Sequence, residues 1–283
     1  LFAEAALVGR TPGTCTLIHR YDHTGENEHD VHAAAAQTFQ VIEVVKEAVT
    51  AERDASGHLY NPTAVPQGGT AKFRIKVNPP GAVPDNDIVW AVAQGANRVS
   101  IVGGDRGREV TIKGESAGET EPFLLVPIVM GLTLDPQPYF RGHVLPETTV
   151  TATVWTVSSS PGGPYPASAT RVHAMIAEAN KILRQVAMKV VWNGTLGTAN
   201  RADWCNLVIT NRTAVPGTAA RQLLDCSGGT GGVELYFVNS ITYMGQAALG
   251  VNDDPGMALC ADAGGHTLAH EILHQCGLND IYT

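Results

Sequence analysis

The sequence has few charged residues and no excess of basic ones. Asp, Glu, Lys and Arg make up only 16% of its 283 residues, and the formal net charge is −8. A nucleic-acid partner is not expected, because phosphate neutralisation requires a basic patch. No apolar stretch approaches the ~20 residues that a membrane-spanning helix needs. With 30 Gly and 16 Pro, the composition favours β-rich extracellular modules over a helical cytosolic enzyme.

Cysteines are also few, and they do not have the CxxC spacing of a cysteine-ligated zinc site. The five are Cys15, Cys205, Cys226, Cys260 and Cys276. The last four allow three pairings, of which we favour Cys205–Cys226 and Cys260–Cys276, with buried free thiols as the alternative. Cys15 is left over. Disulfides would imply an oxidising compartment, so we expect a secreted or cell-surface protein.

Short strand-like segments fill the first half of the chain. Residues 14–20 and 33–45 have strand character, and we expect residues 1–50 to hold the strands of a partial N-terminal β-domain. Further strands are expected at 71–77, 87–92, 98–102, 108–113, 123–129 and 148–157. Their spacing and Pro/Gly turns predict an immunoglobulin-like β-sandwich over residues 51–157.

A different pattern follows residues 158–164, which read SSSPGGP and predict a linker. Apolar residues at helical spacing between 172 and 186 predict an amphipathic helix. Strands are expected at 189–192, 206–210, 231–238, 247–251 and 257–260. We therefore predict a multidomain protein whose residues 165–283 form a separate α+β domain.

The strongest motif lies near the C-terminus and reads HEILHQCGLND from His270 to Asp280. On a helix, positions i and i+4 share a face, so His270 and His274 can present two imidazoles to one metal ion. Glu271 can reach a metal-activated water without ligating the metal itself. Gly277 suits the left-handed end of a helix, after which the chain can return and bring Asp280 to the third ligand position. The pattern predicts a Zn²⁺ site with Glu271 as general base.

Other interpretations of these residues remain open. Two histidines could lie on an ordinary amphipathic helix without binding a metal. His266 lies four residues before His270 and could share the ligand face, although Gly264 and Gly265 favour a position before the helix. The sequence NDDPG at 252–256 could bind calcium, but a turn is its commoner use.

The spacing HExxHxxGxxD resembles the metzincin metallopeptidases, and an aspartate as third ligand is similar to the snapalysin-type branch. The resemblance covers residues 165–283 and implies a zinc peptidase domain. In that family the strand just before the motif helix region forms the edge of the substrate cleft, to which a peptide could add as a strand. The run at 61–73 is similar to bacterial Ig-like surface modules.

One family feature has no counterpart in this chain. Metzincins place a methionine turn beneath the metal, after the motif, whereas Met244 and Met257 precede it and the chain ends at Thr283. We therefore expect the lower subdomain to be missing, with weak or partial zinc binding and low or absent peptidase activity as the consequence.

The resemblance implies an exported zinc endopeptidase that hydrolyses peptide bonds in a protein or glycoprotein substrate. Zinc would acidify a bound water, and Glu271 would take its proton. The alternative function is a surface adhesin whose zinc site is structural or vestigial.

Overall fold

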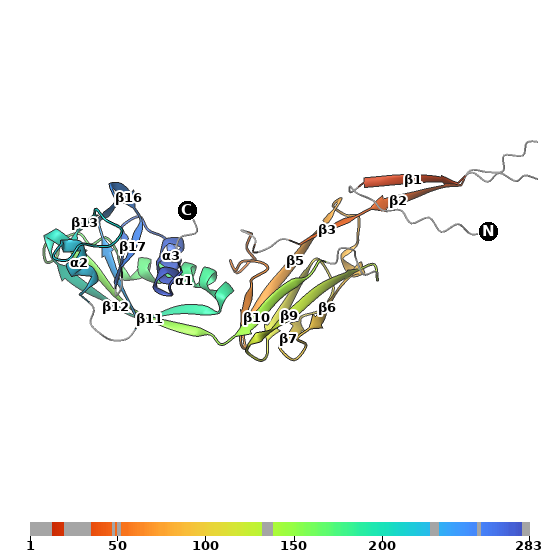
Figure 1. Cartoon of the computed structure of the whole chain (residues 1–283), viewed down its shortest axis with the longest axis horizontal. Coiled ribbons are helices and arrows are strands. Elements are labelled where there is room, and N and C mark those ends of the chain that lie inside the picture. Colours follow the sequence, from red (N-terminus) through yellow and green to blue (C-terminus); the bar gives the residue numbers. More distant parts are fainter. Residues whose placement is uncertain are drawn as a thin grey trace, which may run out of the picture.

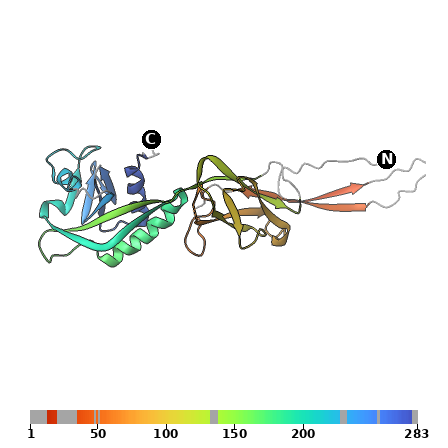
Figure 2. The same ribbon diagram turned by 90° about the horizontal axis from the view of Figure 1, so that it is seen from below.

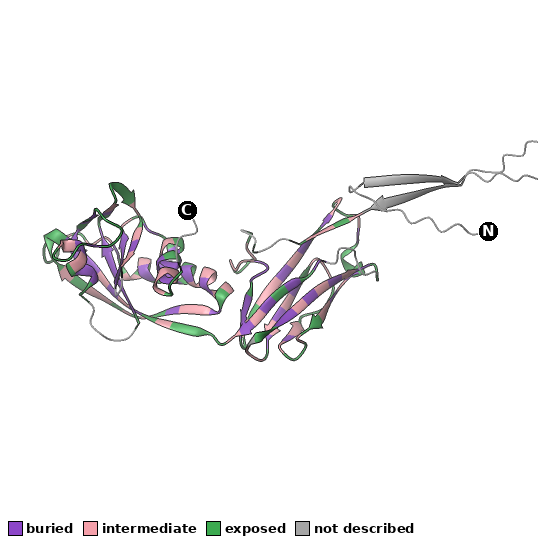
Figure 3. Cartoon of the chain, viewed as in Figure 1, coloured by how far each residue is buried: buried purple, intermediate pink, exposed green. Residues whose placement is uncertain are grey.

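The computed structural model describes residues 13–19, 35–46, 49, 52–131, 138–226, 232–253 and 256–278 (Figure 1). β-Strands are the commonest secondary structure of these residues, and the buried apolar side chains gather into two separate cores, one in each half of the chain (Figure 3). A β-rich protein with more than one core was predicted from the sequence, and the structure confirms this. No helix among the described residues combines the length and apolar character needed to cross a membrane.

The N-terminal unit is built from two four-stranded sheets. The first has the order β3-β5-β8-β7, from Glu43–Lys46, Thr70–Asn78, Glu109–Gly114 and Val99–Val102. The second has the order β4-β10-β9-β6, from Ala64–Pro66, Phe140–Leu145, Gly118–Val129 and Ile88–Gln94. Neighbouring strands are antiparallel except for β4 and β10. A short 3-10 helix, η1 (Asp85–Asp87), precedes β6. A separate antiparallel pair, β1 (Gly13–His19) and β2 (Ala35–Val41), precedes this unit.

Aromatic side chains from both sheets fill the core of the N-terminal unit. The Phe73 ring meets those of Phe123 and Phe140 edge to face, with centroids 5.9 and 5.5 Å apart. Trp90 is only 2% exposed, and its indole nitrogen donates to the Gly107 carbonyl at 2.8 Å. Strand alternation places these side chains on the inward faces, so the two sheets are held together by one apolar layer.

The C-terminal unit is built around a five-stranded sheet with the order β12-β11-β14-β18-β17. The strands are β11 (Thr148–Ser158), β12 (Met188–Asn200), β14 (Val233–Val238), β17 (Gly250–Asp253) and β18 (Gly256–Cys260). The first four in the order are parallel, and β17 closes one edge antiparallel to β18. Two long helices, α1 (Ala169–Leu183) and α3 (Gly265–Gln275), pack against each other, α1 beside β12 and α3 beside β17 (Figure 2).

A smaller sheet completes this unit. It has the order β13-β15-β16, from Asn206–Ile209, Ser240–Tyr243 and Gln246–Ala248, and lies with helix α2 (Ala219–Leu224) and the 3-10 helix η3 (Ala202–Trp204). The 3-10 helix η2 (Arg184–Val186) follows α1.

Helix α1 forms where the sequence predicts a helix. Its N-cap is Ser168, whose hydroxyl accepts from the Arg171 backbone amide at 3.4 Å. The apolar stripe faces the core, and its buried members are Val172, Met175, Ile176, Ala179 and Leu183. Helical periodicity therefore identified both the element and its buried face.

The position of one strand differs from the prediction. Residues 148–157 were assigned to the N-terminal sandwich, but β11 lies between β12 and β14 in the C-terminal sheet. The Thr/Val alternation is typical of a half-buried antiparallel strand, yet the last residues of β11 are buried in succession, as in a central parallel strand. The Ser/Pro/Gly run at 158–164 is consequently the loop between β11 and α1, and residues 146–147 connect the units.

The predicted disulfide pairs are not formed. Cys205, Cys226, Cys260 and Cys276, the four cysteines whose side chains the structure describes, are free thiols. Cys260 ends β18 and Cys276 caps the C-terminal end of α3, so the whole of this helix lies between them in the chain. The buried Cys205 thiol instead contacts the Arg201 carbonyl at 3.5 Å, and burial raises its pKa. Cys15 lies outside the residues whose side chains are described.

Candidate functional site

The HExxH motif lies on α3, whose first turn is fixed by α1. The Gly265 amide donates to the Glu178 carboxylate at 3.2 Å, so a side chain from α1 caps this helix. A Cβ at Gly265 would come within 2.5 Å of the Glu178 Cβ, so the close contact between the helices requires glycine. At the other end, Gly277 has a φ of +84°, which confirms the left-handed helix end predicted from the sequence.

His270 and His274 direct their imidazoles at one point. Their Nε2 atoms are 2.9 Å apart, and the rings meet nearly at right angles. The Nδ1 atom of His274 lies 2.6 Å from the Leu278 carbonyl oxygen, which can only accept a hydrogen bond. This contact is a hydrogen bond in the tautomer that carries the proton on Nδ1, and in that tautomer the Nε2 lone pair is directed at His270.

This pair fits two ligands of a zinc ion. At Zn–N distances of about 2.0–2.1 Å and a tetrahedral angle, two imidazole nitrogens are about 3.3 Å apart, a few tenths of an ångström more than the separation of these two. A metal-ligating histidine commonly donates its second N–H to a carbonyl, as His274 does to Leu278. The donor types and their convergence fit zinc, and a small rotation of either ring would admit it.

Glu271 is the buried member of the motif. It is 5% exposed, and its carboxylate lies against the first residue of β17. A Cβ on Gly250 would lie 2.5 Å from Glu271 Oε1 and 2.9 Å from its Cγ, so the absence of a side chain at Gly250 leaves the space that the carboxylate fills. Helix α3 and the edge strand β17 are therefore in close contact where the Glu271 carboxylate, the expected general base, meets Gly250.

A second residue of β17 holds the same helix. The Asn252 amide donates to the Glu271 carbonyl at 3.0 Å and accepts from the Gln275 side chain at 2.6 Å. Gly250 and Asn252 are two residues apart, so strand alternation places both on the side of β17 that faces α3. Sequence reasoning missed both residues, because nothing in GVND shows contact with a helix twenty residues later.

The remaining predicted ligands are placed as follows. His266 lies near the start of α3, where its Nε2 is 3.5 Å from Glu178 and its side chain is 69% exposed, so it belongs to the cap of the helix. The Asp253 carboxylate accepts from the Ala214 amide at 2.5 Å and pairs with Arg221 at 3.1 Å. Asp280 lies outside the described residues. Among those described, no group of three or more His, Cys, Asp and Glu side chains gathers as a metal site.

The strand predicted to border the cleft also differs in position. The strand just before α3 is β18, which lies inside the sheet, whereas the edge is formed by β17, one strand earlier. The reversal occurs because β17 and β18 form an antiparallel hairpin whose second strand returns into the sheet.

Comparisons of this chain with protein-family models, curated proteins and solved structures found no match.

Proposed function

We propose that this chain is a zinc-dependent endopeptidase of the metzincin type, with His270, His274 and Asp280 as zinc ligands and Glu271 as general base. One observation carries the proposal: the Nε2 atoms of His270 and His274 converge at 2.9 Å beside a buried glutamate. These two imidazoles and the Asp280 carboxylate would supply the three protein ligands that a catalytic zinc site uses.

The chemistry divides between the metal and the chain. When bound, zinc supplies a Lewis acid that acidifies water and polarises a carbonyl. Glu271 accepts a proton from the attacking water on a carboxylate oxygen and delivers it to the leaving amine nitrogen. Asn252 and Gly250 fix the distance between α3 and β17, and so hold that carboxylate in place.

The free edge of strand β17 is an argument for a peptide as the substrate. Within the described residues, β17 pairs on one side only, with β18, so its outer edge can pair with an extended peptide. We infer that the two packed sheets of the N-terminal unit form an Ig-like accessory module and that the protein is exported. From both inferences, the expected substrates are proteins or glycoproteins outside the cell.

The experiment that tests this function is Glu271→Gln, which removes the base and keeps the shape of the side chain. Hydrolysis of a panel of proteins and glycoproteins should fall by about 10²–10⁴-fold, since that is the usual contribution of a general base. The bound zinc should remain. The matched control is Glu121→Gln, a change at an exposed carboxylate that pairs with Arg98 in the N-terminal unit at 2.9 Å.

Two outcomes would contradict the proposal. A Glu271→Gln protein that keeps more than about a tenth of the wild-type rate would remove Glu271 from the mechanism. Hydrolysis of the panel that persists after a chelator has removed the zinc would exclude a zinc-dependent mechanism.

A further inference from the structure

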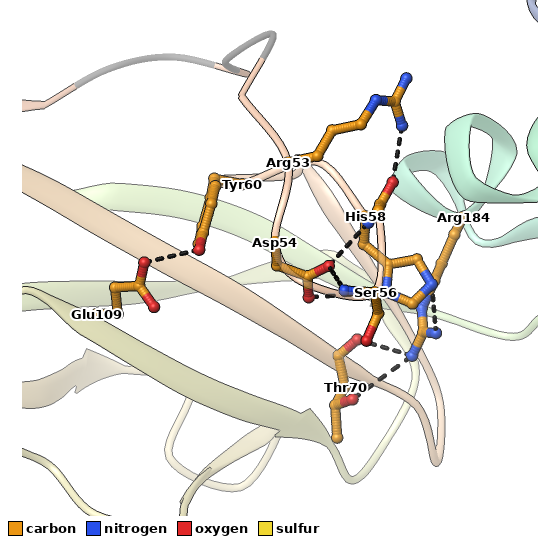
Figure 4. Close-up of polar contacts among 9 residues, drawn as sticks. Arg53, Asp54, Ser56, His58, Tyr60, Thr70, Glu109 and Arg184 are labelled. Carbon is orange, nitrogen blue, oxygen red and sulfur yellow. Dashed lines mark hydrogen bonds and ion pairs between the residues drawn. The ribbon is translucent and has the colours of Figure 1, made fainter.

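A second group of polar side chains joins the two units, far along the chain from the histidine motif. Arg184 of η2 reaches the N-terminal unit, where its Nη2 donates to the Thr70 carbonyl at 2.8 Å and its Nη1 lies 3.3 Å from His58 Nε2 (Figure 4). Figure 4 shows the Arg184 side chain extending from the helix toward Thr70 and His58. The packing of β4 against η2 continues this contact.

These residues border a cavity of about 180 Å³. Its lining comes from both units and includes Asp54, His58, Thr70, Lys72, Lys181 and Arg184. Lys72, Lys181 and Arg184 are half-buried, and Lys181 reaches the loop at Gly57, where an added Cβ would lie 2.8 Å from its Nζ. Three positively charged residues thus line one cavity, in a chain whose net charge is −8.

The negative charge in this cavity does not balance the positive ones. Asp54 is the one acidic residue of its described lining, and its Oδ1 already accepts from the Ser56 and His58 amides, each at 2.9 Å. No described carboxylate forms an ion pair with Lys181 or Arg184. Burial lowers the pKa of His58, and the charges of Arg184 and Lys181 lower it further against the opposing effect of Asp54.

We propose that this cavity binds an oxyanion, a phosphate or sulfate group, between Lys72 of one unit and Lys181 and Arg184 of the other. The guanidinium fork and two ammonium groups are the side chains that recognise such groups. The hydrogen bonds of Arg184 to Thr70 and His58 hold its fork at the cavity before the anion arrives. A bound anion contacts both units and stabilises their arrangement. This inference is independent of the zinc site.

The test is isothermal titration of the full chain with inorganic phosphate and with glucose 6-phosphate, at constant ionic strength in chloride. The first probe represents a free anion and the second an ester on a larger molecule, with glucose as the uncharged control. We expect binding of the phosphate group, and about 10-fold weaker binding in Lys181→Gln and in Lys72→Gln, since each removes a charge-assisted contact. Neither lysine makes a hydrogen bond in the described part of the chain, so both variants should fold.

The matched control is Arg212→Gln, which removes one positive charge from an exposed loop that follows β13. It should bind as the wild type does. The proposal is overturned if the wild type binds neither phosphate probe, or if Lys181→Gln and Lys72→Gln bind no more weakly than Arg212→Gln.

Discussion

The Glu271 carboxylate on α3 lies directly against Gly250, the first residue of the edge strand β17. An added methyl group at Gly250 would be 2.5 Å from Glu271 Oε1 and 2.8 Å from Thr267 Cγ2, closer than van der Waals contact permits. The position of the expected general base therefore depends on a glycine in another element.

Gly250→Ala should displace the Glu271 carboxylate and lower peptidase activity by at least about 10-fold while zinc remains bound, because a small misplacement of a catalytic group is costly. The free energy of unfolding should fall by about 1–3 kcal/mol, as overpacking does. Steady-state kinetics, zinc analysis and denaturant unfolding measure the three effects. The matched control is Gly264→Ala, where an added Cβ meets nothing within 4 Å. Equal activity in both variants would contradict the assigned contact.

Asp280→Ala should weaken zinc binding and abolish most of the activity. His270 and His274 supply two ligands, and a catalytic zinc site has three protein ligands. Competition with a chelator of known affinity measures the change, and Asn279→Ala, one residue earlier, is the control that should bind zinc as the wild type does. Unchanged affinity in Asp280→Ala would require a third ligand from elsewhere in the chain.

The contact between the units should make stability depend on pH through His58. Burial, then Arg184, lowers the His58 pKa below its ordinary value of 6.5. Between the pKa of His58 in the folded chain and 6.5, the unfolded chain binds more protons than the folded one. The stabilising contribution of neutral His58 is therefore present above pH 6.5 and is lost as the pH falls through the folded pKa. Denaturant unfolding between pH 7.5 and 5 tests this, and His58→Asn should show a smaller loss of stability on acidification. An identical pH profile in wild type and variant would contradict it.

Short-range sequence patterns predicted the separate elements well. The helical spacing of apolar residues located α1, and the HExxH spacing with Gly277 located α3 and its left-handed end. Alternation also located strands such as β5 and β8. Each of these signals arises within about ten residues of chain, where backbone geometry alone relates sequence to structure.

Features that depend on distant residues were not predicted. The alternation in β11 is the same whether its neighbours are β12 and β14 or the strands of a sandwich, so periodicity could not assign its sheet. Cysteine spacing could not show that helix α3 separates Cys260 from Cys276. The bond from Arg184 to Thr70 crosses more than a hundred residues, and only the assembled units show it.

The most direct test of the central claim is the zinc content of the purified protein and of three histidine variants. We expect wild type and His266→Ala to bind zinc, because the His266 imidazole pairs with Glu178 at the start of α3. His270→Ala and His274→Ala should each lose most of it, since each removes one of the two imidazoles that converge at 2.9 Å. Zinc retained in both of these variants, or lost in His266→Ala alone, would contradict the account.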